Sequence, residues 1–394
     1  MRVAFSDEQL ALRDELRAYF ARLMTPEIRA EFGEGTSYHY SGPLYKKIVR
    51  QMGADGWLGL GWPKEYGGQG RSFIEHYIFI DECRRADAPV PFVTINTVGP
   101  TLMQYGTTEQ KERFLRPILQ GEIEFAIGYT EPNAGTDLAN LRTKALRDGD
   151  SYVINGQKIF TTGGHEADYI WLAARTNPDV PKHKGLSIFI VDATLPGIKM
   201  TPIMTIDDHR STAVYYEDVR VPADAIVGGE NEGWRMITTQ LNHERVALAC
   251  SGKAEHALDQ VISWARETAA PEGGRVIDRP WVQMTLARCR ARLDALSLLN
   301  WRLAWEMTRD ELNAADASTV KVYGTELFVE IYRALMEVLG DASVLKAGSP
   351  GAILAGRIEQ MYRWAYVVTF GGGVNEIQRE IIATAGLKMP RSGR

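Results

Sequence analysis

Two short segments near residues 130 and 160 carry groups that could contact a planar ligand. The first, Thr130-Glu-Pro-Asn-Ala-Gly-Thr-Asp137, follows the apolar run 125–128 and combines hydroxyl groups with a Pro/Gly loop. Such a loop can bring backbone N–H donors to the edge of a planar cofactor. The second, Lys158-Ile-Phe-Thr-Thr-Gly163, reads as a neighbouring strand with an aromatic residue before two hydroxyls. Taken alone, the first segment is more typical of an ordinary strand-to-turn junction, but the second segment reverses this interpretation in favour of a binding site.

A third segment, Leu241-Asn-His-Glu-Arg-Val-Ala-Leu248, offers a carboxylate that could act as a general base. Ile237, Leu241, Glu244 and Leu248 recur at i, i+4, i+7 and i+11, which predicts a single stripe on one helix. A carboxylate on an apolar stripe is shielded from water, and desolvation raises its pKa toward a useful value for proton abstraction. The helix alone is also compatible with a solvated or ion-paired glutamate.

The elements that must position these segments follow an α–β–α order. A capping-box pattern at Ser6 and Gln9 opens a helical region that is interrupted by the Gly/Pro-rich stretch 56–70. Short β-rich runs separated by turn residues then extend to about residue 230. We therefore predict an α+β, mostly α fold with an all-α domain at 1–121, a small antiparallel β domain at 122–230 and a helical bundle at 231–394.

Two apolar stripes support the predicted C-terminal bundle. They comprise Leu286, Cys289, Leu293, Leu296, Asn300 and Leu303 in one helix, and Gly324, Leu327, Ile331, Leu335 and Val338 in the next.

The composition excludes several classes of function. The chain has 394 residues, a formal net charge of −5 and no dense Lys/Arg run, which argues against nucleic acid as a partner. Its three cysteines form no CxxC pair, and its seven histidines show no metal-ligand spacing, so no metal site is predicted. No segment approaches the roughly 20 apolar residues of a membrane span, and the N-terminus lacks the core of a signal peptide. We expect a cytoplasmic protein.

Four ordered motifs resemble those of the acyl-CoA dehydrogenase family and together span the chain. They are the loop at 130–137, the Phe160-Thr-Thr162 segment, the early turn Pro63-Lys-Glu-Tyr-Gly-Gly-Gln-Gly70 and the late segment Gly373-Val-Asn-Glu-Ile-Gln-Arg379. The α–β–α order is also that family's fold. The resemblance implies an FAD-dependent enzyme that desaturates an acyl-CoA thioester between its α and β carbons, with an electron acceptor such as electron-transfer flavoprotein.

The resemblance also assigns site residues by position. It places Thr136 and Arg245 near the acyl-CoA substrate. The FAD contacts that it implies fall on Ile127, Tyr129, Thr130, Phe160, Thr162, Val374 and Glu376.

The catalytic base departs from the commonest family pattern. Many members carry it as the Glu of a Y-E-G-T motif, but the aligned segment here is Gly371-Gly-Gly-Val374, with Gly372 at the position of the carboxylate. A minority branch, resembling isovaleryl-CoA and some steroid-CoA dehydrogenases, carries the Glu in an E-R pair on a helix. We therefore assign the base to Glu244. The Arg245 of this pair could equally serve a structural ion pair or a CoA phosphate.

Two motifs for the adenine half of FAD are missing. The family's R-x-x-F-G is replaced by the stretch 272–283, and its Q-x-x-G-G-x-G by Glu337-Val-Leu-Gly-Asp341, whose first carboxylate would repel a pyrophosphate. This imbalance suggests an unlike partner chain. The pattern resembles the α-type subunits of actinobacterial α2β2 dehydrogenases that act on cholesterol side-chain CoA thioesters.

Other interpretations stay open at this point. They are a homotetrameric branched-chain acyl-CoA dehydrogenase, an oxidase on the same scaffold, and a non-catalytic subunit that completes another chain's site. Ser318-Thr-Val-Lys321 matches the S-x-x-K pattern of β-lactamases, but it lacks the companion motifs and falls within a helical stripe, so we assign it to chance.

Overall fold

The structure is a computed structural model that describes residues 4–32, 42–309 and 311–390, with the backbone alone for residues 241–248. The chain forms two compact units, each assembled from separate stretches of sequence. The first unit comprises Met1–Tyr38, Arg71–Pro89 and Arg245–Arg394, and the second comprises His39–Gly70 and Val90–Glu244. The predicted domain boundaries at residues 121 and 230 stay a prediction.

The N-terminal part of the first unit contains α1 (Asp7–Leu23), α2 (Pro26–Phe32) and α4 (Phe73–Arg85). The predicted capping box is present, because the Ser6 hydroxyl accepts from the Gln9 N–H and the Gln9 side chain accepts from the Ser6 N–H. The α1 helix packs beside α4 and buries Leu12, Leu16 and Phe20.

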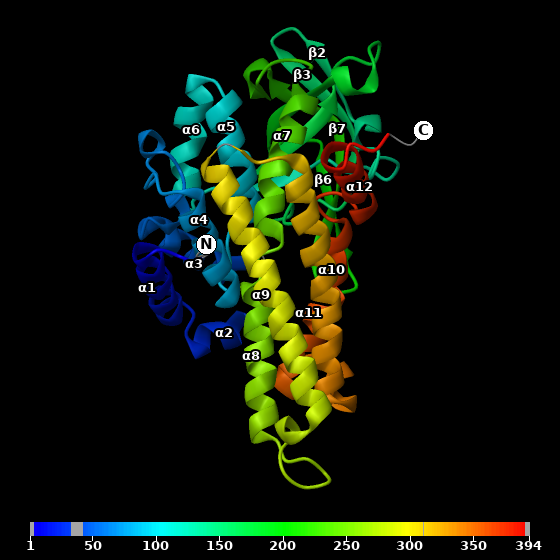
Figure 1. Ribbon diagram of the computed structural model, residues 1–394. Coiled ribbons are helices and arrows are strands. Elements are labelled where there is room, and N and C mark those ends of the chain that lie inside the picture. Colours follow the sequence, from blue (N-terminus) through cyan, green and yellow to red (C-terminus); the bar gives the residue numbers. More distant parts are fainter. Residues whose placement is uncertain (1–3, 33–41, 310, 391–394) are drawn as a thin grey trace. The chain divides into compact units, whose positions relative to one another are not determined.

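The C-terminal part of the first unit is the predicted helical bundle. In Figure 1 the long helices lie side by side, with α9 against α8 and α10, and α10 against α11. Both predicted apolar stripes are buried in this bundle. The helices are α8 (Gly252–Glu267), α9 (Pro280–Thr308), α10 (Ala314–Leu339), α11 (Arg357–Phe370) and α12 (Asn375–Ile381).

The second unit contains α3 (Gly42–Ala54), α5 (Gly99–Tyr105), α6 (Thr108–Leu119) and most of α7 (Gly233–Leu248). The Gly/Pro-rich stretch 56–70 contains only two single-turn 3-10 helices, Trp57–Gly59 and Lys64–Tyr66, as its composition predicts.

An eight-stranded sheet forms the rest of the second unit. Its hydrogen-bonded order is β6-β7-β3-β2-β4-β5-β8, and β1 pairs with β4. The apolar face of this sheet buries side chains from β2, β3, β4, β5 and β7. The strands are β1 (Phe125–Gly128), β2 (Lys144–Asp148), β3 (Ser151–Lys158), β4 (Tyr169–Arg175), β5 (Leu186–Asp192), β6 (Ile198–Met204), β7 (Arg210–Pro222) and β8 (Ile226–Val227).

Two details of the sheet differ from the prediction. It is not purely antiparallel, because β1 and β2 both pair with β4 in parallel. A long connection from β1 to β4 allows this arrangement, as parallel neighbours require a crossover. In addition, the predicted strand 158–163 is wrong: β3 ends at Lys158, and Phe160 has a φ of 59°, outside the strand region. The α+β, mostly α fold is confirmed. None of the helices among the described residues has the length and apolarity to cross a membrane.

Candidate functional site

A buried ion pair fixes the loop that follows β1. The Lys158 ammonium lies 2.8 Å from Glu131 Oε1 and donates to the Tyr129 carbonyl at 3.0 Å. The Glu131 carboxylate also accepts the backbone N–H groups of residues 142 and 143, at 2.6 and 2.8 Å. Both ends of the segment 129–143 are therefore held by the Glu131–Lys158 ion pair. Because Lys158 is the last residue of β3, the end of this strand is held by the same pair.

The charges of this pair are set by burial and by mutual attraction. Burial lowers the pKa of Lys158 to about 8, although the Glu131 carboxylate acts in the opposite direction. For Glu131, burial alone would raise the pKa, but the ammonium and its hydrogen bonds hold the pKa below its usual value. The carboxylate is thus ionised at neutral pH, and the loop is organised around a charge that water does not reach.

Phe160 stands beside this loop in an unusual conformation. Its φ of 59° is costly for a bulky residue, and its ring is 56% exposed. Backbone hydrogen bonds on either side hold it there: the Ile159 N–H donates to the Thr130 carbonyl at 2.9 Å, and the Thr161 N–H to the Thr212 carbonyl at 3.0 Å. An apolar ring held out of the core by the backbone offers a surface to a ligand.

The other residues predicted to contact a cofactor or substrate in this unit lie around the same loop. Thr162 is exposed, with its hydroxyl 3.5 Å from that of Ser211, while Ile127 and Thr130 are half-buried. Thr136 is exposed in the same loop. A Cβ built on Gly163 would meet no atom within 4 Å, so the space beside these residues is open. Exposed hydroxyls next to an exposed aromatic ring fit a planar heterocycle with polar edges.

Tyr129 differs from these residues, because its side chain is buried rather than presented to a ligand. Its hydroxyl accepts from Trp171 Nε1 at 3.1 Å and donates to Gln240 Oε1. The Gln240 amide in turn donates to Thr101 Oγ1 at 2.9 Å, and Thr101 donates to the Thr97 carbonyl at 2.7 Å. If Tyr129 contacts a cofactor, it does so with its backbone.

Glu131, Lys158 and Gln240 have no predicted role in the site, although a sequence signal existed for two of them. Lys158 ends a strand whose residues at 152 and 154, on the same side by alternation, are apolar, and Glu131 is the only carboxylate in the adjoining loop before Asp137. A buried lysine needs such a partner. No local pattern pointed to Gln240.

The predicted base lies on α7. Met236, Ile237 and Gln240 are buried, so this helix has an interior face over its described part. The predicted stripe continues through Glu244, but the side chains of residues 241–248, including Glu244 and Arg245, lie outside the described residues. Their roles stay predictions.

In the first unit, a buried lysine fixes the glycine-rich turn before α12. Lys321 Nζ, on α10, donates to the carbonyls of Thr369 and Gly373 at 2.9 and 2.8 Å and to Asn375 Oδ1 at 2.7 Å. Gly372 has a φ of 67°, a conformation that favours glycine over a residue with a side chain. The backbone at the position of the usual family base is therefore shaped for the absence of a side chain.

The predicted cofactor residues of this turn have different exposures. Val374 is half-buried, and Glu376 is exposed in the first turn of α12. The S-x-x-K match is structural, because Ser318 and Lys321 are both fully buried. Ser318 donates to Gln378 Oε1 at 2.9 Å. Ser318 and Lys321 therefore stabilise the turn at α12, and Ser318 is not a nucleophile.

The stretch that replaces the family's adenine-binding motif is an exposed loop between α8 and α9. The Glu272 carboxylate pairs with the Arg279 guanidinium, and Arg275 donates to the Glu267 carbonyl. These contacts engage both arginines within the loop itself. Position 275, where the family motif has its aromatic residue, is an arginine, and the aromatic residue of the stretch 272–283 is Trp281, which is exposed in the first turn of α9.

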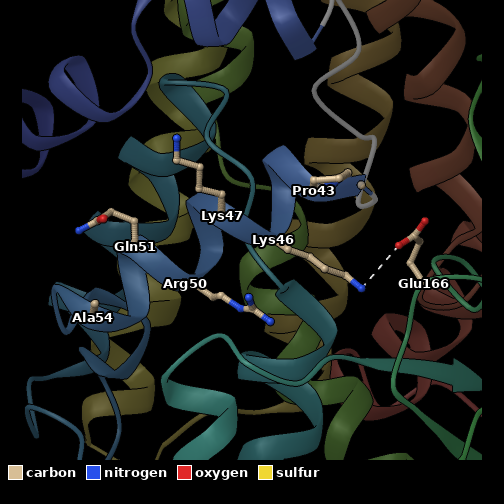
Figure 2. A pocket seen from close by; sticks show the side chains of 8 residues that line it. Pro43, Lys46, Lys47, Arg50, Gln51, Ala54 and Glu166 are labelled. Atoms are coloured by element: carbon tan, nitrogen blue, oxygen red, sulfur yellow. Dashed lines mark ion pairs between the residues drawn. The ribbon is translucent and has the colours of Figure 1, made fainter.

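A groove of about 680 Å³ in the second unit shares no residue with the predicted site. Figure 2 shows it along α3, with Lys46 directed toward Glu166 at 3.6 Å and Arg50 reaching into the same space. Tyr45, also on α3, donates to the half-buried Glu124 carboxylate. Burial raises the pKa of Glu124 to about 7, and the nearby Asp168 adds to this effect.

Three family models match successive parts of the chain. Their descriptions are acyl-CoA dehydrogenase N-terminal domain for residues 6–122, middle domain for residues 126–219 and C-terminal domain for residues 231–387. Together they cover most of the sequence.

Individual proteins match over the whole length. The acyl-CoA dehydrogenase FadE26 of Mycobacterium tuberculosis is 52% identical over 400 residues, which covers 100% of both chains. The crystal structure of the ChsE4-ChsE5 complex from Mycobacterium tuberculosis contains a chain with 52% identity and a TM-score of 0.93, with full coverage of both chains. A structure described as the Tcur3481-Tcur3483 steroid ACAD matches at 52% identity and a TM-score of 0.92, again over both full chains.

Proposed function

Because the chain belongs to the acyl-CoA dehydrogenase family, we propose that it desaturates a steroid side-chain acyl-CoA thioester, with FAD as cofactor and Glu244 as base. The observation that supports FAD as the cofactor is the exposed side chain of Phe160. It lies beside the loop 129–137, which the Lys158–Glu131 ion pair holds in place. The steroid part rests on the relative described as a steroid ACAD.

The reaction needs two groups on opposite sides of the substrate. The α-proton of a thioester is weakly acidic, so a carboxylate of raised pKa must take it, and this is the role proposed for Glu244. Bound FAD supplies the acceptor for the hydride that leaves the β carbon. The glycine turn at 371–373 offers no carboxylate, and Gly372 lies in a left-handed conformation. These features support the assignment of the base to α7.

The residues proposed to hold FAD are those that the family resemblance assigns by position. Thr130 and Thr162 would supply hydroxyl groups and backbone donors, and Phe160 would lie against the ring. Ile127, Tyr129, Val374 and Glu376 complete the proposed set, with Tyr129 acting through its backbone because its hydroxyl is engaged by Gln240 and Trp171. Thr136 and Arg245 are proposed to contact the thioester substrate.

We further propose that a related but unlike chain completes the site. The loop at 272–279 engages Arg275 and Arg279 in its own contacts, and it has glutamate and arginine at positions 272 and 275, where the family motif has arginine and phenylalanine, so it is poorly suited to the adenine half of a neighbour's FAD. Two structures that match over the full chain carry paired names, the ChsE4-ChsE5 complex and the Tcur3481-Tcur3483 steroid ACAD. Such paired names support an assembly of two different chains. Electron-transfer flavoprotein is the proposed electron acceptor.

The test is to co-express the chain with a candidate partner and to count FAD per chain. The assay then follows dye reduction with a steroid side-chain CoA thioester, a branched short-chain acyl-CoA and a straight-chain acyl-CoA. Preference for the steroid thioester and the need for a partner support the proposal. Full activity of the isolated chain on the branched substrate would instead support a homotetrameric branched-chain enzyme, and hydrogen peroxide production would indicate an oxidase.

A further inference from the structure

We infer that Tyr129 and Gln240 form a latch that positions α7, and with it Glu244, relative to the loop 129–137. The latch is the buried hydrogen bond from the Tyr129 hydroxyl to Gln240 Oε1. The inference rests on the proposed function, since it gives Tyr129 and Gln240 a role in the placement of the proposed base. Both are positioning residues, and neither side chain is proposed to touch the substrate.

The latch is one link in a series of hydrogen bonds that runs from Trp171 to Thr97. An indole N–H can only donate, so the Tyr129 hydroxyl accepts from Trp171, and it donates to Gln240 Oε1. The amide group of Gln240 then donates to Thr101 Oγ1. The Thr101 hydroxyl donates a hydrogen bond to the Thr97 carbonyl, which can only accept. The series therefore runs from a group that can only donate, the Trp171 indole N–H, to one that can only accept, the Thr97 carbonyl.

Burial makes this series of hydrogen bonds costly to break. Trp171, Gln240 and Tyr129 are 0%, 3% and 7% exposed, so water does not replace a lost partner at these positions. The series joins β4, the loop after β1, α7 and α5, which are distant in sequence. It therefore acts as a cross-link among four elements of one unit.

The latch lies a few residues along the backbone from the proposed FAD contact Thr130 and from the proposed base Glu244. Tyr129 precedes Thr130, and its carbonyl is held by Lys158, so its main chain and its side chain are both fixed. Gln240 precedes Glu244 by four residues, about one helical turn or 6 Å of rise. A helix transmits a shift at Gln240 directly to Glu244. Proton abstraction depends steeply on the distance from the base to the α carbon, so small shifts are costly.

The first experiment compares the wild-type complex with Tyr129→Phe and Gln240→Met. Each variant keeps the side-chain size and removes the latch. We expect kcat to fall by about ten- to a hundredfold, with KM for the acyl-CoA changed by less than about threefold. Hydrogen–deuterium exchange of the backbone amides of residues 236–248 should accelerate, and this readout needs neither substrate nor bound flavin.

A matched control is Tyr152→Phe. Tyr152 is also buried in the second unit and donates to Glu230 at 3.0 Å, but it has no contact with the latch. This variant should leave kcat and the exchange of α7 unchanged. Thr101→Val removes only the next link of the series, so it serves as the milder variant if the Tyr129 substitution prevents folding.

Several outcomes would overturn the inference. These are unchanged α7 exchange in Tyr129→Phe and Gln240→Met, a loss of activity that appears only in KM, or equal effects in Tyr152→Phe. Inactivity of the wild-type complex on every acyl-CoA would instead contradict the proposed function. In that case the exchange measurement alone would still decide whether the latch holds α7.

Discussion

At the scale of single residues, the Lys158–Glu131 pair should be more sensitive to the loss of one partner than to the loss of both. Lys158→Met leaves the Glu131 carboxylate buried without its cation, which should cost about 3–5 kcal/mol in the free energy of unfolding. Adding Glu131→Gln removes that charge and should recover part of the loss. Urea unfolding monitored by intrinsic fluorescence measures both. A double variant as unstable as the single variant would contradict this account.

The proposed base gives the second prediction. Glu244→Gln keeps the size of the side chain but removes the proton acceptor, so turnover should fall by about two to four orders of magnitude. Flavin absorbance of the purified complex should be unchanged. Substantial residual activity would exclude Glu244 as the base.

The sequence predicts which residues gather around the loop better than it predicts their geometry. The family resemblance implied that Thr130, Phe160 and Thr162 belong to one site, and in the structure the Ile159 N–H donates to the Thr130 carbonyl. The left-handed backbone of Phe160 was not predictable, because it depends on hydrogen bonds to residues far away in sequence. The buried hydroxyl of Tyr129 was missed for the same reason, since its partner is Gln240.

At the scale of secondary-structure elements, Lys321 links α10 to the turn before α12. Lys321→Met should lower the free energy of unfolding by about 3 kcal/mol, because three acceptor oxygens lose their donor. Lys199→Met is a suitable control, since Lys199 pairs with Glu217 on the surface and should contribute less than about 1 kcal/mol. Equal destabilisation by the two substitutions, measured in urea, would refute the role of Lys321.

The Glu124 carboxylate that accepts from Tyr45 should make stability depend on pH. Its folded-state pKa of about 7 lies above the unfolded value, so the native state holds the proton more tightly. Stability from this group is therefore present at low pH and is lost as pH rises from about 4.5 to 7.

Glu124→Gln should remove this dependence while retaining an acceptor for Tyr45. At pH 8 the variant should be more stable than wild type by on the order of 3 kcal/mol, and near pH 4 the two should be similar. Thermal melting at several pH values tests this. If the two proteins show parallel pH profiles, another group accounts for the dependence.

Helices were predicted more reliably than strands, for a physical reason. The stripes of α9 and α10 follow from a local 3.6-residue period, and every residue of both stripes is buried. Strand pairing is not local: the parallel pairing of β1 with β4 joins residues more than 40 positions apart. The segment after Lys158 has the composition of a strand, but the loop at Thr130 competes for its hydrogen bonds and ends β3 there.

At the scale of the whole molecule, the isolated chain should bind FAD poorly, and an unlike partner with an Arg and an aromatic residue at the equivalent loop should restore binding. In this chain Arg279 forms an ion pair with Glu272, and Arg275 donates to the Glu267 carbonyl. Pyrophosphate and adenine need cationic and stacking groups from across an interface. Flavin absorbance after gel filtration, with and without the partner, gives the occupancy.

The same loop offers a substitution test of this idea. Glu272→Arg together with Arg275→Phe should raise the FAD occupancy of the isolated chain, because the change frees Arg279 and adds an aromatic ring. Glu272→Gln alone frees Arg279 without adding the ring and serves as the control. Four tightly held FAD molecules in a homotetramer of the unmodified chain would refute the heteromeric assembly.

The series of hydrogen bonds from Trp171 to Thr97 has a consequence for how this protein can change over generations. Replacing Tyr129 alone removes the acceptor of the Trp171 indole N–H and the donor to Gln240 Oε1, and replacing Gln240 alone removes the acceptor of the Tyr129 hydroxyl. Each single step is unfavourable, whereas simultaneous replacement by apolar residues is tolerable. We therefore expect Tyr129, Trp171, Gln240 and Thr101 to be inherited as a set, so that descendants retain all four or lose them together.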